Sequence, residues 1–457
     1  RDRRTESHCG VGNMTGPLDW TLATVAAATG GVIDGDPTMP VHSISTDSRA
    51  VEPGSVFVAI RGERHDGHDF AADAVGVGAV AALVERDSHA GLVPRIEVED
   101  TTTALRDLAA CRRNELRMPV VSVTGSTGKT STKDLLAAAI PGSWASPRSY
   151  NNEIGVPLTV LTTPDDATAL VIEVGSRGLG HIKWLMPAIR PTVAVITNLG
   201  VVHFETFGSR DAVADGKWEL VEGLTEGATA VLPDDEPRLR REHPGPTVTF
   251  GESPEALVRI SNLSTDDEGR PSFEIRSCGR VLPVTLLMAG PHNARNAAAA
   301  FAAATAIGID PAVAASGMST AVASPWRMDV RTGRFTVVND AYNANPTSMA
   351  AALRTVAAMP GRSYAILGEM AELGSITTEE HRRIGVLAAD LAYQDVVTVG
   401  QDHGLAAEAG GKNVENASDA FDRVMEQIRD GDVVLVKASR SVGLETVAER
   451  LVEVAAS

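Results

Sequence analysis

Pro119-Val-Val-Ser-Val-Thr-Gly-Ser-Thr-Gly-Lys-Thr-Ser131 is a run that changes character part-way along. Residues 119–124 are apolar and rich in β-branched side chains, which is typical of a buried strand, whereas a helical pattern runs from Lys129 to Ile140. Glycine-rich residues join the two. This succession of strand, loop and helix predicts one unit of an α/β fold with a parallel sheet.

The loop of this unit predicts a phosphate-binding site. Backbone N–H groups around glycines wrap an anion, and the N-terminus of the following helix adds the positive end of its dipole. Lys129 would reach the β- and γ-phosphates of ATP, and Thr130 would place its hydroxyl on Mg²⁺. Val123 stands where the common phosphate loop has its first glycine, so the alternative is a glycine turn that only caps a helix. The predicted ATP-binding residues of the loop are Gly125, Ser126, Thr127, Gly128, Lys129, Thr130 and Ser131.

The chain after this unit continues the alternation of strands and helices. Buried-strand patterns recur at residues 169–174, 193–197 and 229–232, and a helical pattern covers residues 209–222. This is the pattern of a parallel sheet with crossover helices. Residues 247–287 alternate short strands with turns instead, which predicts an antiparallel edge.

Two further α/β segments flank this sheet. Residues 18–108 mix a short helix at 21–29 with strand patterns at 55–60 and 79–84. After a helix at 293–307, Ser324-Pro-Trp326 marks a break. The strands predicted beyond the break are 336–339, 364–367, 396–399 and 433–437. We therefore expect three domains, at residues 14–110, 111–323 and 324–457.

Composition excludes several classes of protein. The 457 residues carry 41 basic and 59 acidic side chains, and the net charge of −18 disfavours binding to nucleic acids and to anionic membranes. The longest apolar run, residues 297–309, is too short for a transmembrane helix. Three widely spaced cysteines indicate neither disulfides nor a zinc site, so we expect a cytoplasmic protein. Residues 1–13 are polar, which makes Met14 the expected natural start.

Three further side chains are candidates for a metal site. Glu173 ends one predicted strand and His203 follows another, and parallel sheets collect their sites at such strand ends. A lone loop histidine is, however, more often without special function. Lys217 lies in the predicted helix 209–222, and without other information a solvated surface lysine is the favoured interpretation.

Asparagines supply a second group of candidates. Asn151-Asn152 and His292-Asn293-x-x-Asn296 offer amides that suit hydrogen bonds to a base or a sugar. Asparagine is equally a turn and cap residue, so these positions decide little by themselves.

A longer ordered set of motifs is more specific than any of these residues alone. It comprises Ser45-Thr-Asp-Ser-Arg49, Asp66-Gly-His-Asp69, the phosphate loop, Tyr150-Asn-Asn-Glu-Ile-Gly155, Glu173, His203, Lys217-Trp-Glu219, His292-Asn-Ala-Arg-Asn296, Arg327 and Asp340-Ala-Tyr-Asn-Ala-Asn-Pro346. In this order and spacing the chain resembles the Mur ligase family from about Met14 to Val454. Three motifs resemble the members that add D-alanyl-D-alanine: Tyr342–Pro346, Leu367–Gly374 and Val436–Ser441. The departures from the family pattern are Asn339, Val174 and Ala438.

The resemblance implies a fold and a reaction. The fold is an N-terminal UDP-sugar-binding domain, a central P-loop ATPase-like domain with a parallel sheet, and a C-terminal Rossmann-like domain that closes over ATP. The reaction transfers the γ-phosphate of ATP to the terminal carboxylate of UDP-MurNAc-tripeptide, and the amine of D-Ala-D-Ala then attacks the acyl phosphate. ATP and Mg²⁺ are the implied cofactors, and a monomer is expected.

The resemblance also assigns roles to residues. Those implied in catalysis are Lys129, Glu173, His203 and Lys217, and those implied in ATP binding, besides the loop, are Asn296, Arg327 and Asp340. The implied metal ligands are Thr130, Glu173, His203 and a carbamylated Lys217. The implied substrate-binding residues are Ser48, Arg49, Asp66, His68, Asn151, Asn152, Tyr342, Asn343 and Asn345. For Asn343 and Asn345 the alternative is that they only stabilise the turn before Pro346.

Two other functions are weighed against this one. Another amide ligase of the same superfamily, acting on folate or on a peptide polymer, is disfavoured by the N-terminal Ser-Thr-Asp-Ser-Arg and Asp-Gly-His elements, which argue for a UDP-sugar. A non-catalytic ATP-binding regulator is disfavoured because the four implied catalytic residues are intact.

Overall fold

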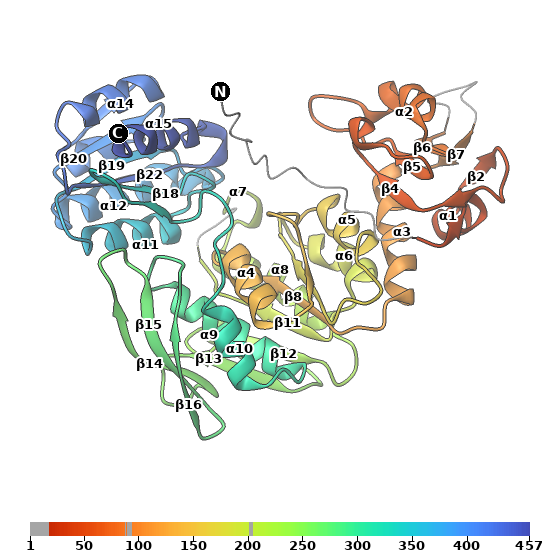
Figure 1. The fold of residues 1–457 in the computed structure, drawn as a ribbon, viewed down its shortest axis with the longest axis horizontal. Helices are drawn as coiled ribbons and strands as arrows, with labels where there is room; N and C mark the ends of the chain where they lie inside the picture. The colour runs from red at the N-terminus through yellow and green to blue at the C-terminus, as the bar shows by residue number, and fades with distance from the viewer. Residues whose placement is uncertain (1–17, 87, 89–93, 201–203) are drawn as a thin grey trace, which may run out of the picture.

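The structure, a computed structural model, describes residues 18–86, 88, 94–200 and 204–457. Three α/β units follow one another along the chain, each built around its own sheet (Figure 1). Within the described residues, no helix is long and apolar enough to cross a bilayer. The α/β class predicted from the sequence is confirmed.

The N-terminal unit contains a five-stranded sheet in the order β2-β7-β6-β5-β4. Only the edge strand β2 is antiparallel to its neighbour. The strands are β2 (Val32–Asp34), β4 (Ser43–Ser45), β5 (Ser55–Val58), β6 (Ala81–Glu85) and β7 (Arg95–Val98). A separate ladder joins β1 (Trp20–Thr21) to β3 (Pro40–Val41). The helices are α1 (Leu22–Thr29), α2 (Ala71–Val77) and α3 (Thr101–Glu115).

The central unit contains a nine-stranded sheet in the order β16-β15-β14-β13-β12-β11-β8-β10-β9. Its parallel strands are β8 (Val120–Thr124), β9 (Trp144–Ala145), β10 (Leu170–Glu173), β11 (Val193–Ile196), β12 (Thr229–Pro233) and β13 (Thr247–Gly251). The first helices are α4 (Lys129–Ala139), α5 (Gly155–Leu161), α6 (His181–Ile189), α7 (Phe204–Phe207) and α8 (Arg210–Glu222). The last two are α9 (Asn293–Ala306) and α10 (Pro311–Met318).

The two faces of this sheet have separate cores. Val121 and Val123 of β8 pack with α4, α9 and α10 on one face. Val120 and Leu170 pack on the other face, where α3, α5 and α6 join one core that continues into the N-terminal unit. Burial on both faces explains why the strands read as continuous apolar runs.

One prediction about the edge of the sheet is wrong in part. β13 runs parallel to β12, and β14 (Val258–Thr265) begins parallel to β13 through Phe250 and Gly251. Only β14, β15 (Pro271–Ser277) and β16 (Arg280–Thr285) pair antiparallel. The antiparallel edge therefore starts at residue 258 rather than 247, because hairpin turns join these three strands whereas residues 252–257 bridge two parallel ones.

The C-terminal unit contains a six-stranded sheet in the order β17-β18-β22-β19-β20-β21, in which only β17 is antiparallel. The strands are β17 (Asp329–Arg331), β18 (Thr336–Asn339), β19 (Ser363–Gly368), β20 (Asp395–Val399), β21 (Lys412–Val414) and β22 (Val433–Lys437). The helices are α11 (Pro346–Ala357), α12 (Thr377–Asp390), α13 (Leu405–Ala409), α14 (Ala417–Met425) and α15 (Glu445–Ala455). Helices on both faces make this unit doubly wound, as a Rossmann-like domain requires.

Candidate active site

The glycine-rich loop between β8 and α4 has backbone angles that suit glycine. Gly125 has φ +151° and Gly128 has φ +77°, and both values lie where residues with a Cβ are disfavoured. A Cβ on Gly125 would also lie 1.9 Å from Thr197 Oγ1 on the neighbouring strand end. Lys129 begins α4, and its Nζ donates to the Gly125 carbonyl oxygen at 2.8 Å. The Lys129 side chain is thus folded back over the loop. A phosphate group bound there would accept a hydrogen bond from Nζ in place of the Gly125 carbonyl oxygen.

The loop is fastened to the segment that follows β11. Thr127 N–H donates to Asn198 Oδ1 at 3.0 Å, and Asn198 Nδ2 donates to Thr127 Oγ1 at 2.8 Å. The Ser126 hydroxyl accepts from Gly200 N–H at 2.8 Å. Asn198 was not among the predicted site residues, although it directly follows the predicted strand at residues 193–197. These contacts hold the loop in shape.

A cavity of about 440 Å³ opens between this loop and the C-terminal unit. Histidine, asparagine and arginine side chains of α9 and of the segment after Ser324 line it together with the loop. The predicted residues that it brings together are Ser126, Thr127, Gly128, Lys129, Thr130, Ser131, Asn151, Glu173, Asn296, Arg327, Asp340, Tyr342, Asn343 and Asn345. Of the predicted site residues that the structure describes, those that do not line the cavity are Gly125, Asn152, Lys217, Ser48, Arg49, Asp66 and His68.

Glu173 is fixed at one wall of the cavity. It ends β10, it is 1% exposed, and its Oε1 accepts from Asn151 Nδ2 at 2.6 Å. Its Oε2 is also buried and has no hydrogen-bond partner among the described residues. A buried carboxylate oxygen without a partner is unfavourable unless a cation or another donor meets it. Thr130, also in the lining, supplies a hydroxyl oxygen, so the pair offers the hard oxygen ligands that Mg²⁺ prefers.

These two residues do not make a complete metal cage by themselves. Within the described ranges, no group of three or more His, Cys, Asp or Glu side chains is placed to hold a metal ion. Of the other predicted ligands, His203 lies outside the described residues, and Lys217 would serve only after it acquired a carboxylate.

Lys217 lies on α8 and is 1% exposed, so the interpretation as a surface lysine is wrong. Burial lowers its pKa well below the ordinary value of 10.5, and the nearby positive charge of Lys129 lowers it further. Lys129 itself has a lowered pKa, chiefly from burial; the Glu173 carboxylate opposes this effect and Arg327 adds to it. Two lysines therefore lie close together in a poorly solvated region, and a neutral amine is favoured at Lys217.

Arg327 reaches the cavity from the segment that joins the central and C-terminal units. Its Nη2 donates to Ser149 Oγ at 3.1 Å, and its guanidinium carbon lies 4.2 Å from the centroid of the Tyr342 ring. The Ser149 hydroxyl is also 3.4 Å from Thr130 Oγ1. Arg327 thus places a cation next to the phosphate loop while it stacks on the C-terminal unit.

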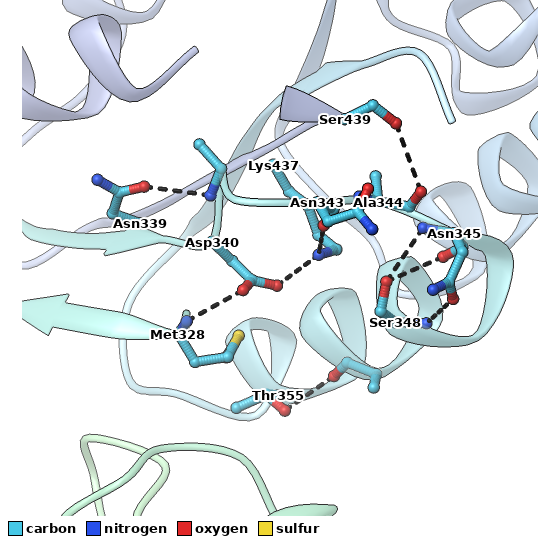
Figure 2. Close-up of polar contacts among 12 residues, drawn as sticks. Met328, Asn339, Asp340, Asn343, Ala344, Asn345, Ser348, Thr355, Lys437 and Ser439 are labelled. Carbon is cyan, nitrogen blue, oxygen red and sulfur yellow. Dashed lines mark hydrogen bonds and ion pairs between the residues drawn. The ribbon is translucent and has the colours of Figure 1, made fainter. Parts of the chain in front are cut away.

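Asn345 lies on the loop that connects β18 to α11. Its Oδ1 accepts from Ser348 N–H at 2.9 Å, and its own N–H donates to Ser348 Oγ at 3.1 Å, which makes a capping box at the start of α11 (Figure 2). This is the turn-stabilising alternative that the sequence left open. Asn343 uses its Oδ1 to accept from Ala344 N–H at 2.9 Å.

Comparisons with known proteins identify the family of this chain. The model of the Mur ligase middle domain matches residues 123–304, that of the Mur ligase glutamate ligase domain residues 326–440, and that of the Mur ligase family catalytic domain residues 40–113. The UDP-N-acetylmuramoyl-tripeptide–D-alanyl-D-alanine ligase of Bacillus subtilis is 34% identical over 434 residues, which cover 90% of this chain and 93% of the relative. The chain belongs to the Mur ligase family.

Solved structures of Mur ligases have the same fold. MurF from Acinetobacter baumannii matches with a TM-score of 0.88 and 30% identity, over 96% of this chain and all of that one. MurF from Thermotoga maritima, solved in complex with ADP, matches with a TM-score of 0.81 and 28% identity, over 90% of this chain and 97% of that one.

The N-terminal residues assigned through the Mur ligase resemblance lie on the first unit. His68 is 3% exposed; its Nδ1 lies 2.6 Å from Asp66 Oδ1, and its Nε2 accepts from Glu85 N–H at 3.0 Å. Arg49 is exposed, and its Nη2 lies 2.7 Å from Asp47 Oδ2. His68 therefore shapes the loop after β5, whereas Arg49 presents its guanidinium to solvent.

Two cavity residues of this Mur ligase, Lys437 and His292, stand in motifs quoted from the sequence but received no predicted role of their own. Lys437 ends β22 and its Nζ donates to Asp340 Oδ2 at 2.6 Å (Figure 2). His292 precedes α9, and its Nδ1 is buried without a hydrogen-bond partner among the described residues. The sequence signal for Lys437 was a charged residue at the end of an apolar strand, the same signal that identified Glu173.

Proposed function

We propose that this Mur ligase joins D-Ala-D-Ala to UDP-MurNAc-tripeptide at the expense of ATP, in the synthesis of peptidoglycan precursors. The observation that carries the proposal is the cavity itself, which brings the phosphate loop together with Arg327 and with Tyr342 and Asn343 of the C-terminal unit. Relatives from Bacillus subtilis and Escherichia coli, each 34% identical to this chain, are named for this reaction.

The reaction has two steps. The terminal carboxylate of the tripeptide attacks the γ-phosphorus of ATP, which forms an acyl phosphate and releases ADP. The amine of D-Ala-D-Ala then attacks the acyl carbon, which forms the amide and releases phosphate. Negative charge builds up on phosphoryl and tetrahedral oxygens in both steps, and the cations of Lys129 and Arg327 stabilise it at the loop. Asn296 of α9 and Asp340 of the C-terminal unit, both in the lining, suit the rest of the nucleotide.

The residues at the cavity wall fit a magnesium site. We assign Glu173 Oε2, which has no partner among the described residues, and the hydroxyl of Thr130, another lining residue, as ligands. We assign His203 and a carbamylated Lys217 to the same site. Magnesium, when bound, would add positive charge beside the transferred phosphoryl group. Asn151 contributes by holding Oε1, so that Glu173 keeps its second oxygen turned to the site.

Carbamylation of Lys217 is chemically favoured by its surroundings. A neutral amine attacks CO₂, forms an N–C bond and releases a proton, whereas an ammonium group has no electron pair to give. Burial keeps the pKa of Lys217 low, so that the neutral amine is available. The product is an anion, which would pair with the cation of Lys129 rather than repel it.

Substrate contacts and organisation complete the proposal. We assign UDP-sugar binding to Ser48, Arg49, Asp66 and His68, tripeptide binding to Asn151 and Asn152, and dipeptide binding to Tyr342, Asn343 and Asn345. The domain boundaries are proposed at 14–110, 111–323 and 324–457. A monomer that acts in the cytoplasm, where ATP and nucleotide sugars are made, is part of the same proposal.

A competition assay tests the function. The protein is given ATP, Mg²⁺ and UDP-MurNAc-tripeptide, with D-Ala-D-Ala, D-Ala, meso-diaminopimelate and L-Lys at equal concentration, and products are identified by mass. We expect phosphate release and incorporation of the dipeptide. Incorporation of a single amino acid would contradict the dipeptide assignment, and absence of phosphate release with every acceptor would contradict the ligase assignment.

A further inference from the structure

Lys437 is a buried cation at the junction of two units. It is 1% exposed, and its Nζ donates both to Asp340 Oδ2 at 2.6 Å and to the Asn343 carbonyl oxygen at 2.7 Å (Figure 2). A buried ammonium group is unfavourable unless it is paired and hydrogen-bonded, so these two contacts hold the end of β22 firmly to the loop after β18.

Asp340 also contacts the segment that joins the central and C-terminal units. Its second oxygen, Oδ1, accepts from Met328 N–H at 3.1 Å. Figure 2 shows the three residues in line, with the Asp340 carboxylate between Lys437 and Met328. One carboxylate therefore connects the C-terminal sheet to the backbone next to Arg327.

The backbone on both sides of Arg327 is strained. Trp326 has φ +61° and Met328 has φ +49°, which is the left-handed region that residues with a side chain rarely occupy. Such angles persist only where the surroundings hold them. At Met328 the holding contact is the bond to Asp340, and at Trp326 it is the Tyr342 N–H, which donates to the Trp326 carbonyl oxygen at 3.2 Å.

The two strained residues determine where Arg327 points. Its guanidinium lies between the Tyr342 ring, 4.2 Å from the centroid, and the Ser149 hydroxyl of the central unit, at 3.1 Å. Its charge lies close enough to Lys129 to lower the pKa of that lysine. If the segment relaxed, the guanidinium would leave the phosphate end of the cavity.

We propose that Lys437 is a positioning residue: through Asp340 it holds the strained backbone at Met328, and thereby keeps Arg327 aimed at the nucleotide phosphates. The proposal rests on the proposed function, because it assumes that the cavity binds ATP. It differs from two simpler roles, in which Lys437 contacts the nucleotide itself or only stabilises the C-terminal unit.

A double-mutant cycle separates these roles. Affinity for a non-hydrolysable ATP analogue with Mg²⁺ is measured by calorimetry for the wild-type protein, Lys437→Met, Arg327→Ala and the double variant. We expect each single variant to bind about tenfold more weakly or worse, as for lost hydrogen bonds to charged groups. The double variant should match Arg327→Ala within about twofold, because Lys437 acts through Arg327. A double variant whose loss is the product of the two single losses would overturn the proposal, as would unchanged affinity in Lys437→Met.

Arg423→Met is the matched control. Arg423 is a cation of the same unit whose Nη2 donates to the buried Asp395 at 3.1 Å, at the opposite end of the sheet strands. The Arg423→Met variant should have a lower melting temperature than the wild-type protein and the same affinity for the analogue. A loss of affinity equal to that of Lys437→Met would show that general loosening of the C-terminal unit is enough to weaken binding, and would overturn the proposal. Lys437→Gln, which keeps a donor, replaces Lys437→Met in the cycle if that variant does not fold. Failure of the wild-type protein to release phosphate with UDP-MurNAc-tripeptide and D-Ala-D-Ala would contradict the proposed function alone, since the cycle reads nucleotide binding.

Discussion

Gly128 lies directly against Asn296: a Cβ on Gly128 would be 2.3 Å from Asn296 Oδ1. The N-cap of α4 and the first turn of α9 therefore meet without room for a methyl group. Asn296 is itself held, because its Nδ2 donates to Asn293 Oδ1 at 2.8 Å and Asn293 donates to the Ala289 carbonyl oxygen at 2.7 Å. The glycine is thus required twice, for its backbone angle and for this contact.

We expect Gly128→Ala to lower nucleotide affinity by at least about tenfold, since either the loop or Asn296 must move to admit the methyl group. Isothermal titration with ADP measures the loss. Gly227→Ala is the matched control, because Gly227 has nearly the same φ, +75°, with nothing within 4 Å of the added Cβ. That variant should lose about 1 kcal/mol of unfolding free energy from backbone strain and keep its affinity for ADP. Equal affinity in Gly128→Ala and the wild-type protein would refute the role given to this contact.

Lys217→Ala is expected to reduce kcat at least about a hundredfold, because the site loses the anion that carbamylation supplies and Lys129 loses its partner. Acetate or propionate at high concentration should restore part of the rate, since a small carboxylate fits the space of the lost carbamate. Initial rates of phosphate release against carboxylate concentration give the result.

The control for that rescue is another buried lysine. Lys133→Ala removes a side chain that is 5% exposed and pairs with Asp134 at 2.8 Å, and carboxylates should not restore whatever activity it loses. Full activity of Lys217→Ala without additive would show that its burial serves packing only.

Asn345→Ala should lower the free energy of unfolding by about 1 kcal/mol, because the capping box at the start of α11 is lost. Urea denaturation measures the change. Asn345→Asp keeps an oxygen for the Ser348 N–H and should recover most of the stability. A stability equal to that of the wild-type protein in the alanine variant would indicate that the Asn345 amide is reserved for a ligand.

Strands that are buried on both faces were predictable from the sequence, whereas short and partly exposed ones such as β2, β17 and β21 were not. β18 and β22 have the predicted bounds. β8 and β11 differ from their predicted bounds by one residue at one end, and β10 differs by one residue at each end. The direction of β13 was not predictable, since a run of five residues reads alike in parallel and antiparallel pairs. Pairing direction depends on the connection that follows, which is a tertiary property.

The site was predictable where a motif carries its own chemistry. The phosphate loop needs glycines, a lysine and a helix start in one short run, so sequence alone defined it. Lys217 was different, because lysine is rarely fully buried and the residue type alone therefore pointed to solvent, whereas Gly216 to Val221 of α8 are all buried. Lys437 was missed for a related reason: its partner Asp340 is 97 residues away in the chain, and only the parallel pairing of β18 with β22 brings the two strand ends together.

His292 makes the stability of the protein depend on pH in a definite direction. Burial lowers its pKa from the ordinary value of 6.5; the Asp340 carboxylate opposes this shift and the Lys437 cation adds to it. Between the lowered pKa and 6.5, the unfolded chain therefore binds more protons than the folded chain. The contribution of His292 to stability is full above pH 6.5, declines as the pH falls below that value, and levels off below the pKa of the folded state.

We accordingly expect His292→Gln to weaken the loss of stability between about pH 7 and pH 5, because a neutral amide takes up no proton in either state. Denaturant unfolding of both proteins at half-unit pH steps gives the difference in unfolding free energy at each pH. That difference should shift in favour of the variant as the pH falls, since protonation would place an imidazolium beside the cation of Lys437. His65→Gln, at an exposed histidine, is the control for removing an imidazole as such. Parallel curves for His292→Gln and the wild-type protein would mean that the folded protein binds the proton at His292 as readily as the unfolded chain does, and the electrostatic account of this corner of the cavity would be wrong.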